Sequence, residues 1–244
     1  LFVVAPLLVL FYYAFTNGSG QFTLSNFTGF FTDPNAMGTL FYSFAVAVVT
    51  TLVCLLLAYP IACILAFSKL KAKSALVMIF VLPMWINFSL RITALKEILT
   101  VFEGNLAMYP FFNAVVGMTY DFLPFMILPI YTTVSRLDGA LREAAMDLGA
   151  NEAQTFLRVT LPLSVPGIMS GISMVFLPAM TNYVVLDMLY NSTYIMGSLI
   201  GSYFSAYNWN GGSMIALILL GIICLFTLLT DGGDESTSRG GALL

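Results

Sequence analysis

Charged side chains are sparse in this chain of 244 residues, and they gather between Arg136 and Arg158. Charges of both signs beside small alanines suit recognition of a polar partner, because they orient a docked surface and let it approach closely. The chain contains no His, so the commonest general base and zinc ligand is missing. The sequence also shows no metal-ligand spacing and no GxxxxGK[ST] phosphate loop. We therefore expect no catalytic, metal or cofactor site on this chain, and the charged stretch suits either water or a polar partner.

Local signals divide this stretch into two short helices. Asp138 is placed to cap a helix through GALREAAMDL, which ends at Gly149, a residue suited to the left-handed conformation after a helix. That helix is roughly 15 Å long, too short to cross a membrane. Asn151 and Gln154 have capping-box spacing and predict the start of a second helix. We expect the Leu161–Pro162 pair to end it, because a residue before proline avoids the helical region.

One face of the first short helix combines apolar and small residues, which are Leu141, Ala144, Ala145 and Leu148. The alanines would allow close approach of a partner, and three charged neighbours would fix its orientation: Arg142, Glu143 and Asp147. The alternative is an ordinary amphipathic loop that packs beneath its own membrane spans. Spacing alone does not separate the two interpretations.

The rest of the chain has the composition of an integral membrane protein. Hydrophobic residues make up 59% and charged residues 9%, against roughly 25% charged residues in an average soluble domain. The continuous apolar blocks predict an all-α protein with about six transmembrane helices. Their expected ranges are about 1–16, 40–67, 75–92, 106–132, 161–186 and 212–230.

We expect one transmembrane domain over 1–230, with a loop at 133–160, followed by a polar tail. The tail, 231–244, reads DGGDESTSRGGALL and lacks apolar periodicity, which predicts disorder or a cloning remnant. The first block is short for a span and begins with Leu1, so we expect its start to precede this residue. Pro124 and Pro129 predict kinks in the fourth span, which serve packing or shape a pathway.

Charge asymmetry predicts the orientation of the chain in the membrane. The connections 68–74 and 133–160 are separated by two spans and must lie on one side. They carry six cations, whereas the opposite side carries two, Arg91 and Lys96. The positive-inside rule places both loops in the cytoplasm, and six spans then place both termini there.

Asp121 is the leading candidate for contact with a transported substrate, because an ionisable group deep in a span is a functional hypothesis by default. The alternative is that Asp121 caps a helical segment that carries Pro124 in its first turn. Tyr120, Trp85 and Asp187 are weaker candidates. Trp85 also suits packing or an anchor at the membrane interface. Asp187 could lie where a cation enters or where a binding protein docks, and the alternative is that it is simply solvated.

Six residues between Arg136 and Pro162 match the EAA motif of ABC importer permeases: Glu143, Ala144, Ala145, Gly149, Leu161 and Pro162. The resemblance implies the type I ABC importer (MetI-like) permease fold, in a bacterial inner membrane. It also implies that the loop is a coupling helix seated in a groove of an ATP-hydrolysing subunit. Glu143 would then make polar contact with that subunit, the two alanines would permit close approach, and Gly149 would form the turn.

A resemblance over nearly the whole chain narrows the family. The chain resembles the first permease subunit of spermidine/putrescine importers. The resemblance includes the segments LAYPIACILA, LPMWINFSLRITALKEIL and GMTYDFLPFMILPIYTTVSRLDGALREAAMDLGA. The implied partners are a second homologous permease, two ATP-binding subunits that hold ATP and Mg²⁺, and an external binding protein. This chain would itself be non-catalytic. The alternatives are a permease for thiamine, ferric iron, sulfate or molybdate, or a self-sufficient secondary transporter.

Overall fold

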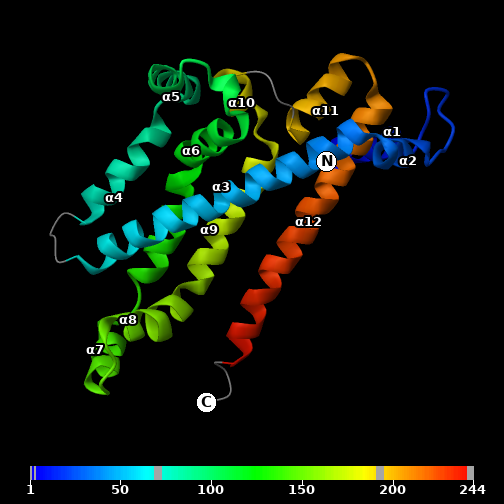
Figure 1. Cartoon of the computed structure of the whole chain (residues 1–244). Coiled ribbons are helices and arrows are strands. Elements are labelled where there is room, and N and C mark those ends of the chain that lie inside the picture. The colour runs from blue at the N-terminus through cyan, green and yellow to red at the C-terminus, as the bar shows by residue number, and fades with distance from the viewer. Residues whose placement is uncertain (1, 3, 69–72, 191–194, 241–244) are drawn as a thin grey trace. The chain divides into compact units, whose positions relative to one another are not determined.

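The computed structural model describes residues 2, 4–68, 73–190 and 195–240, and helices dominate these ranges. In chain order the helical elements are α1 (Val4–Ala14), α2 (Ser25–Thr32), α3 (Pro34–Phe67), α4 (Lys73–Val81), η1 (Leu82–Trp85), α5 (Phe88–Glu103), η2 (Leu106–Met108), α6 (Pro110–Val134), α7 (Gly139–Asp147), α8 (Glu152–Thr155), η3 (Phe156–Thr160), α9 (Leu161–Thr181), α10 (Tyr183–Leu189), α11 (Met196–Ser205) and α12 (Trp209–Gly240) (Figure 1). Within the described ranges the chain forms no strand, only an isolated bridge between Thr16 and Phe22. The all-α membrane fold predicted from the sequence is confirmed.

Four of the described helical segments are long and apolar enough to cross a membrane, namely Pro34–Phe67, Pro110–Val134, Glu152–Thr181 and Trp209–Leu228. A fifth crossing is possible if a bent pair of helices, Ala75–Trp85 and Phe88–Glu103, counts as one span. The first expected span contains only the 11-residue helix α1. The six expected segments are therefore four continuous spans, one bent pair and one short helix.

The expected span at 75–92 is not one continuous helix, because the chain bends by 96° between Ala75–Trp85 and Phe88–Glu103. The 3-10 turn η1 ends at Trp85, and the next residue, Ile86, is extended with ψ 144°. The Asn87 side chain then accepts a hydrogen bond from the Ser89 N–H at 2.9 Å and starts α5. The bend is therefore built by a local capping signal, Asn-Phe-Ser, inside an apolar run.

The described chain divides into two compact units, of which the first contains 1–47 and 177–244. In this unit α1 packs against α12, and the end of α1 is held by side-chain amides. Asn210 Nδ2 donates to the carbonyl oxygens of Tyr13 at 3.0 Å and Thr16 at 2.6 Å, and Asn26 Nδ2 donates to Ala14 O at 2.9 Å. These amides satisfy carbonyls that a helix end leaves without an intrahelical partner.

The second unit contains residues 48–176 and has α6 at its centre. Helix α9 approaches α6 through Gly167 and Gly171, which have the small-xxx-small spacing of closely packed membrane helices. A Cβ atom added at Gly171 would lie 2.6 Å from Met126 Sδ, and one at Gly167 would lie 2.8 Å from Pro129 O. The two prolines of α6 lie within one continuous helix, and at least Pro129 lies in this packing contact.

The last helix differs from the expected tail. Helix α12 continues to Gly240, so the backbone of residues 231–240 is helical where the sequence predicted disorder. Continuing an existing helix adds a hydrogen bond for each residue fixed, whereas starting a new one is unfavourable. The polar segment therefore extends the apolar span Trp209–Leu228 that precedes it.

Candidate functional site

Helix α7 begins and ends at the predicted residues. The Asp138 carboxylate accepts a hydrogen bond from the Ala140 N–H at 3.0 Å, which confirms the cap. After the helix, Gly149 has a φ of +87°. The Gly149 N–H donates to Met146 O at 2.9 Å and the Ala150 N–H donates to Ala145 O at 3.0 Å. This pair of bonds is the Schellman motif, and it turns the chain sharply out of α7.

The second short helix also starts as predicted but does not end as predicted. Asn151 and Gln154 form a reciprocal capping box, with hydrogen bonds of 2.8 and 3.0 Å. The expected end at the Leu161–Pro162 pair is wrong, because α8, η3 and α9 form one helical segment, Glu152–Thr181. A π-helical turn accommodates the proline: the Leu161 N–H donates to Phe156 O, five residues back. This wider turn shifts the backbone where the proline ring would otherwise clash with a carbonyl oxygen.

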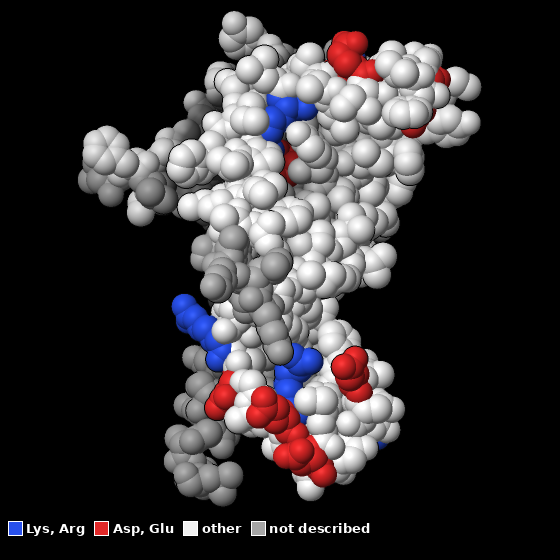
Figure 2. Space-filling view, turned by 90° about the vertical axis from the view of Figure 1, so that its left-hand side faces the viewer, with Lys and Arg blue, Asp and Glu red and all other residues white. Residues whose placement is uncertain are grey.

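The apolar face of α7 is open to its surroundings. Leu148 is 90% exposed and Leu141 is 48% exposed. The alternative in which this face packs beneath the protein's own spans is therefore wrong. Figure 2 shows that acidic and basic side chains gather over this loop, while the neighbouring surface carries almost none. An apolar face rimmed by charge is the anatomy of a protein-docking surface.

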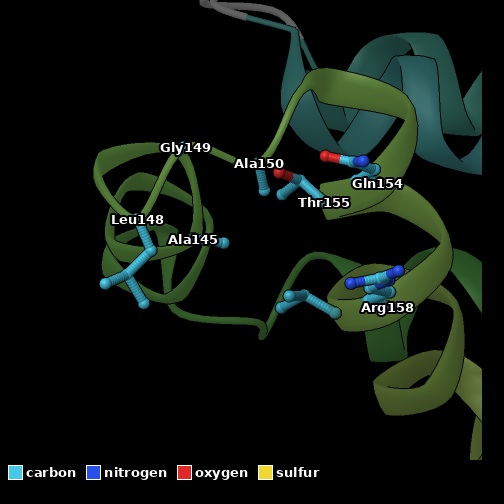
Figure 3. A pocket seen from close by; sticks show the side chains of 8 residues that line it. Ala145, Leu148, Gly149, Ala150, Gln154, Thr155 and Arg158 are labelled. Atoms are coloured by element: carbon cyan, nitrogen blue, oxygen red, sulfur yellow. The ribbon is translucent and has the colours of Figure 1, made fainter.

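A shallow hollow of about 320 Å³ lies between α7 and the α8–η3 helix, lined by Ala145, Leu148, Gly149, Ala150, Gln154, Thr155, Arg158 and Val159. Figure 3 shows the turn at Gly149 on one side of the hollow and Gln154, Thr155 and Arg158 on the other. The small side chains at 145, 149 and 150 keep the hollow open. Its rim therefore offers both backbone and charged groups to a partner.

The charged residues of α7 fall into two groups. Glu143 and Asp147 are exposed and form no ion pair within the described part of the chain. Arg142 instead lies over the Phe67 ring, with its Cζ 4.1 Å from the ring centroid. Arg142 thus anchors α7 to the end of α3 by a cation–π contact, a role that the sequence did not reveal.

A second set of contacts joins α3 to the helical segment that follows the loop. The Tyr59 hydroxyl of α3 shares a hydrogen bond of 2.8 Å with the Ser164 hydroxyl of α9. The Tyr59 ring also meets the Phe156 ring edge to face, with centroids 5.7 Å apart. Helix α3 therefore contacts both α7 and the helix that leads out of the loop.

Asp121 lies in the middle of α6 and is 4% exposed. Its Oδ1 accepts a hydrogen bond of 2.7 Å from Arg91 Nη2, and the two side chains form a buried ion pair. The capping alternative is wrong, because α6 runs without a break from Pro110 to Val134. Arg91 was assigned from the sequence to an outside connection and was missed as the partner of Asp121.

The remaining candidates do not join Asp121. Tyr120 is 40% exposed and lines a hollow of about 570 Å³ with apolar residues of α3, α5 and α6. Trp85 is 79% exposed at the end of η1, and Asp187 is exposed on α10 in the other unit. Within the described ranges, none of these three residues forms a hydrogen bond or an ion pair with Asp121.

Residues 58–233 match the family of binding-protein-dependent transport system inner membrane components, and the chain belongs to this family. It is 34% identical to the spermidine/putrescine transport system permease protein PotB of Haemophilus influenzae, in an alignment that covers 98% of this chain and 91% of the relative. PotB of Escherichia coli is also 34% identical, with coverages of 85% and 81%. The family predicted from the EAA residues is confirmed.

Solved structures of low sequence identity share the fold. A bacterial ABC transporter involved in the import of alginate matches with a TM-score of 0.78 and 15% identity, over 97% of this chain and 90% of that chain. The MetNI methionine ABC transporter in an inward-facing conformation matches with a TM-score of 0.64 and 17% identity, over 82% and 94%. These similarities confirm the MetI-like permease fold.

Proposed function

We propose that this chain is the transmembrane permease subunit of an ATP-driven importer for polyamines. The observation that carries the proposal is its 34% identity to a spermidine/putrescine permease along nearly the full length of both chains. A buried carboxylate on α6, Asp121, supports a cationic substrate only once its partner Arg91 is displaced, because the pair itself is neutral. Sulfate and molybdate importers would gain from positive charge along the pathway instead.

The α7–α8 loop is the proposed coupling element. Its exposed apolar face meets a groove of an ATP-binding subunit, while Glu143 and Asp147 orient the contact through charge. Ala144 and Ala145 allow close approach, and the Gly149 turn holds α7 at a fixed angle to α8. Arg142 stabilises the position of α7 through its cation–π contact with Phe67.

The proposed assembly contains a second homologous permease, two ATP-binding subunits and an external binding protein. ATP and Mg²⁺ bind to the ATP-binding subunits, and this chain contributes half of the translocation pathway without catalysis of its own. The coupling loop and both termini lie in the cytoplasm. The six cations of the two connections on this side support that orientation.

Stimulation of ATP hydrolysis tests the substrate. The assembled complex is reconstituted in liposomes with binding proteins loaded with spermidine, putrescine, thiamine or ferric iron. We expect stimulation by a polyamine-loaded binding protein and none by the others. Stimulation only by thiamine or iron would overturn the polyamine assignment and leave the permease assignment in place.

A charge reversal tests the coupling loop. Glu143→Lys removes an exposed acidic contact from the docking face, so we expect uptake to fall about tenfold or more, with normal amounts of chain in the membrane. Glu97→Lys on α5 makes the same charge change at another exposed position and serves as the control. Normal uptake by the Glu143 variant would contradict the coupling role.

A further inference from the structure

The Arg91–Asp121 pair is buried but only partly satisfied. The side chains are 9% and 6% exposed, and a single hydrogen bond joins Nη2 to Oδ1. The other two nitrogens of Arg91, Nε and Nη1, are buried and have no hydrogen-bond partner in the described structure. A guanidinium can bind a carboxylate through two parallel bonds, and this one does not. The pair therefore lacks the geometry that makes a buried ion pair strong.

The position of Arg91 on α5 also makes its interaction with Asp121 less favourable. Arg91 is the fourth residue of α5, directly after the 96° bend. The first turn of a helix carries a positive partial charge, so a cation there is disfavoured. The Arg91 Cζ also lies 5.9 Å from the centroid of the Phe88 ring of the same helix.

Asp121, in contrast, needs a cation. A buried carboxylate without a counter-charge is costly, whereas the pair as a whole is neutral. A neutral pair gives little attraction to a polycation, so Asp121 in this state is not available to the substrate. An alkylammonium group carries the same charge as the guanidinium and also donates N–H hydrogen bonds. Exchange of one cation for the other would keep the charge at Asp121 balanced.

We propose that Arg91 is an internal substitute for the substrate cation, held at Asp121 until a polyamine ammonium group displaces it. This inference rests on the proposed function, since it assigns the polyamine a contact within the same permease. Displacement releases Arg91 and removes one of the side-chain contacts between α5 and α6, while Asn113 Nδ2 of α6 still donates to Glu103 Oε2 of α5 at 2.8 Å. Arg91 thereby sets a threshold: a ligand binds at Asp121 only if it competes with a guanidinium already in place.

Direct binding of radiolabelled spermidine tests the exchange. The probe is added to the purified complex of permeases and ATP-binding subunits, without the binding protein. If Arg91 occupies the carboxylate about 90% of the time, Arg91→Gln lowers the apparent Kd about tenfold. Asp121→Asn and the double variant Arg91→Gln/Asp121→Asn lose this binding. Lys96→Gln removes a cation from the same helix that forms no ion pair in the described structure, and should bind as the unmodified complex does.

A purely structural pair gives a different pattern. Arg91→Gln would then bind spermidine no better than the unmodified complex, and that result would overturn the inference. If Arg91→Gln alone fails to assemble, the double variant decides, because it contains no unpaired buried charge at the site. Its uptake is expected to be lost, and uptake equal to that of the unmodified complex would overturn the exchange.

Failure of this inference is distinguishable from failure of the proposed function. If a polyamine-loaded binding protein stimulates ATP hydrolysis by the unmodified complex, the proposed function holds whatever Arg91→Gln does. If only a binding protein loaded with another ligand stimulates hydrolysis, the polyamine assignment is wrong, and the exchange at Asp121 is wrong with it.

Discussion

The α7–α8 loop and the Arg91–Asp121 pair use charge in opposite ways. In the loop, Glu143 and Asp147 are exposed and form no ion pair in the described structure, so each can be replaced without stranding a partner. In the pair, both charges are buried and each depends on the other. Exposed charge can therefore serve recognition with little effect on stability, whereas buried charge affects stability and function together.

The largest effect is expected where one buried charge loses its partner. Asp121→Ala leaves the Arg91 guanidinium buried and unpaired, which should lower the free energy of unfolding by about 3–5 kcal/mol. Asp147→Ala in the loop is the matched change and should cost less than about 0.5 kcal/mol. Thermal unfolding of the purified complex in detergent measures both. Equal melting temperatures for the two variants would break the contrast between loop and pair.

The next effect concerns the turn that ends α7. Gly149 has a φ of +87°, and a Cβ atom added there would meet nothing within 4 Å. The cost of a side chain is therefore conformational, about 1–2 kcal/mol for Gly149→Val. Gly149→Asn, which tolerates this conformation, should cost clearly less.

Uptake assays on both Gly149 variants test the role of the turn. We expect about a tenfold loss of uptake for valine and a much smaller loss for asparagine, with equal amounts of chain in the membrane. If the two variants transport equally well, the Schellman turn does not set the position of α7.

The smallest effect concerns the contact that anchors the loop. Phe67→Leu and Arg142→Gln each remove the cation–π contact, so their combined effect should be less than additive by about 0.5–1 kcal/mol. Arg158 is exposed and has no such ring contact in the described structure. Arg158→Gln combined with Phe67→Leu should therefore be additive. A double-mutant cycle on thermal stability measures both pairs, and equal coupling in both would contradict the anchoring role of Arg142.

The sequence predicted the loop well because its signals are local. The Asp138 cap reaches two residues along the chain, the Asn151 capping box reaches three, and Gly149 specifies its own conformation. The end at Leu161–Pro162 was predicted wrongly, because the rule for proline assumes an α-helical turn before it and the chain forms a π-helical turn instead.

The sequence predicted only half of the buried pair. Asp121 was recognised from its depth in a span, but its partner lies 30 residues earlier in the chain, on α5. The available signal was the sign of the charges: two opposite ionisable groups near neighbouring spans are expected to pair in an apolar setting. The bend before α5 had a local signal, the Asn87 cap, which the surrounding apolar residues obscured.

The π-helical turn has a mechanical consequence. Because the chain stays helical through Pro162, the segment that begins after the cap at Asn151 and the membrane segment form one continuous helical stretch of 30 residues, Glu152–Thr181. In Figure 1 the α8–η3 part runs across the loop and α9 turns upward from it, as expected where a π-helical turn and a proline meet. Under the proposed coupling role, a displacement of α7 would reach the membrane segment through helical backbone alone, without a non-helical linker.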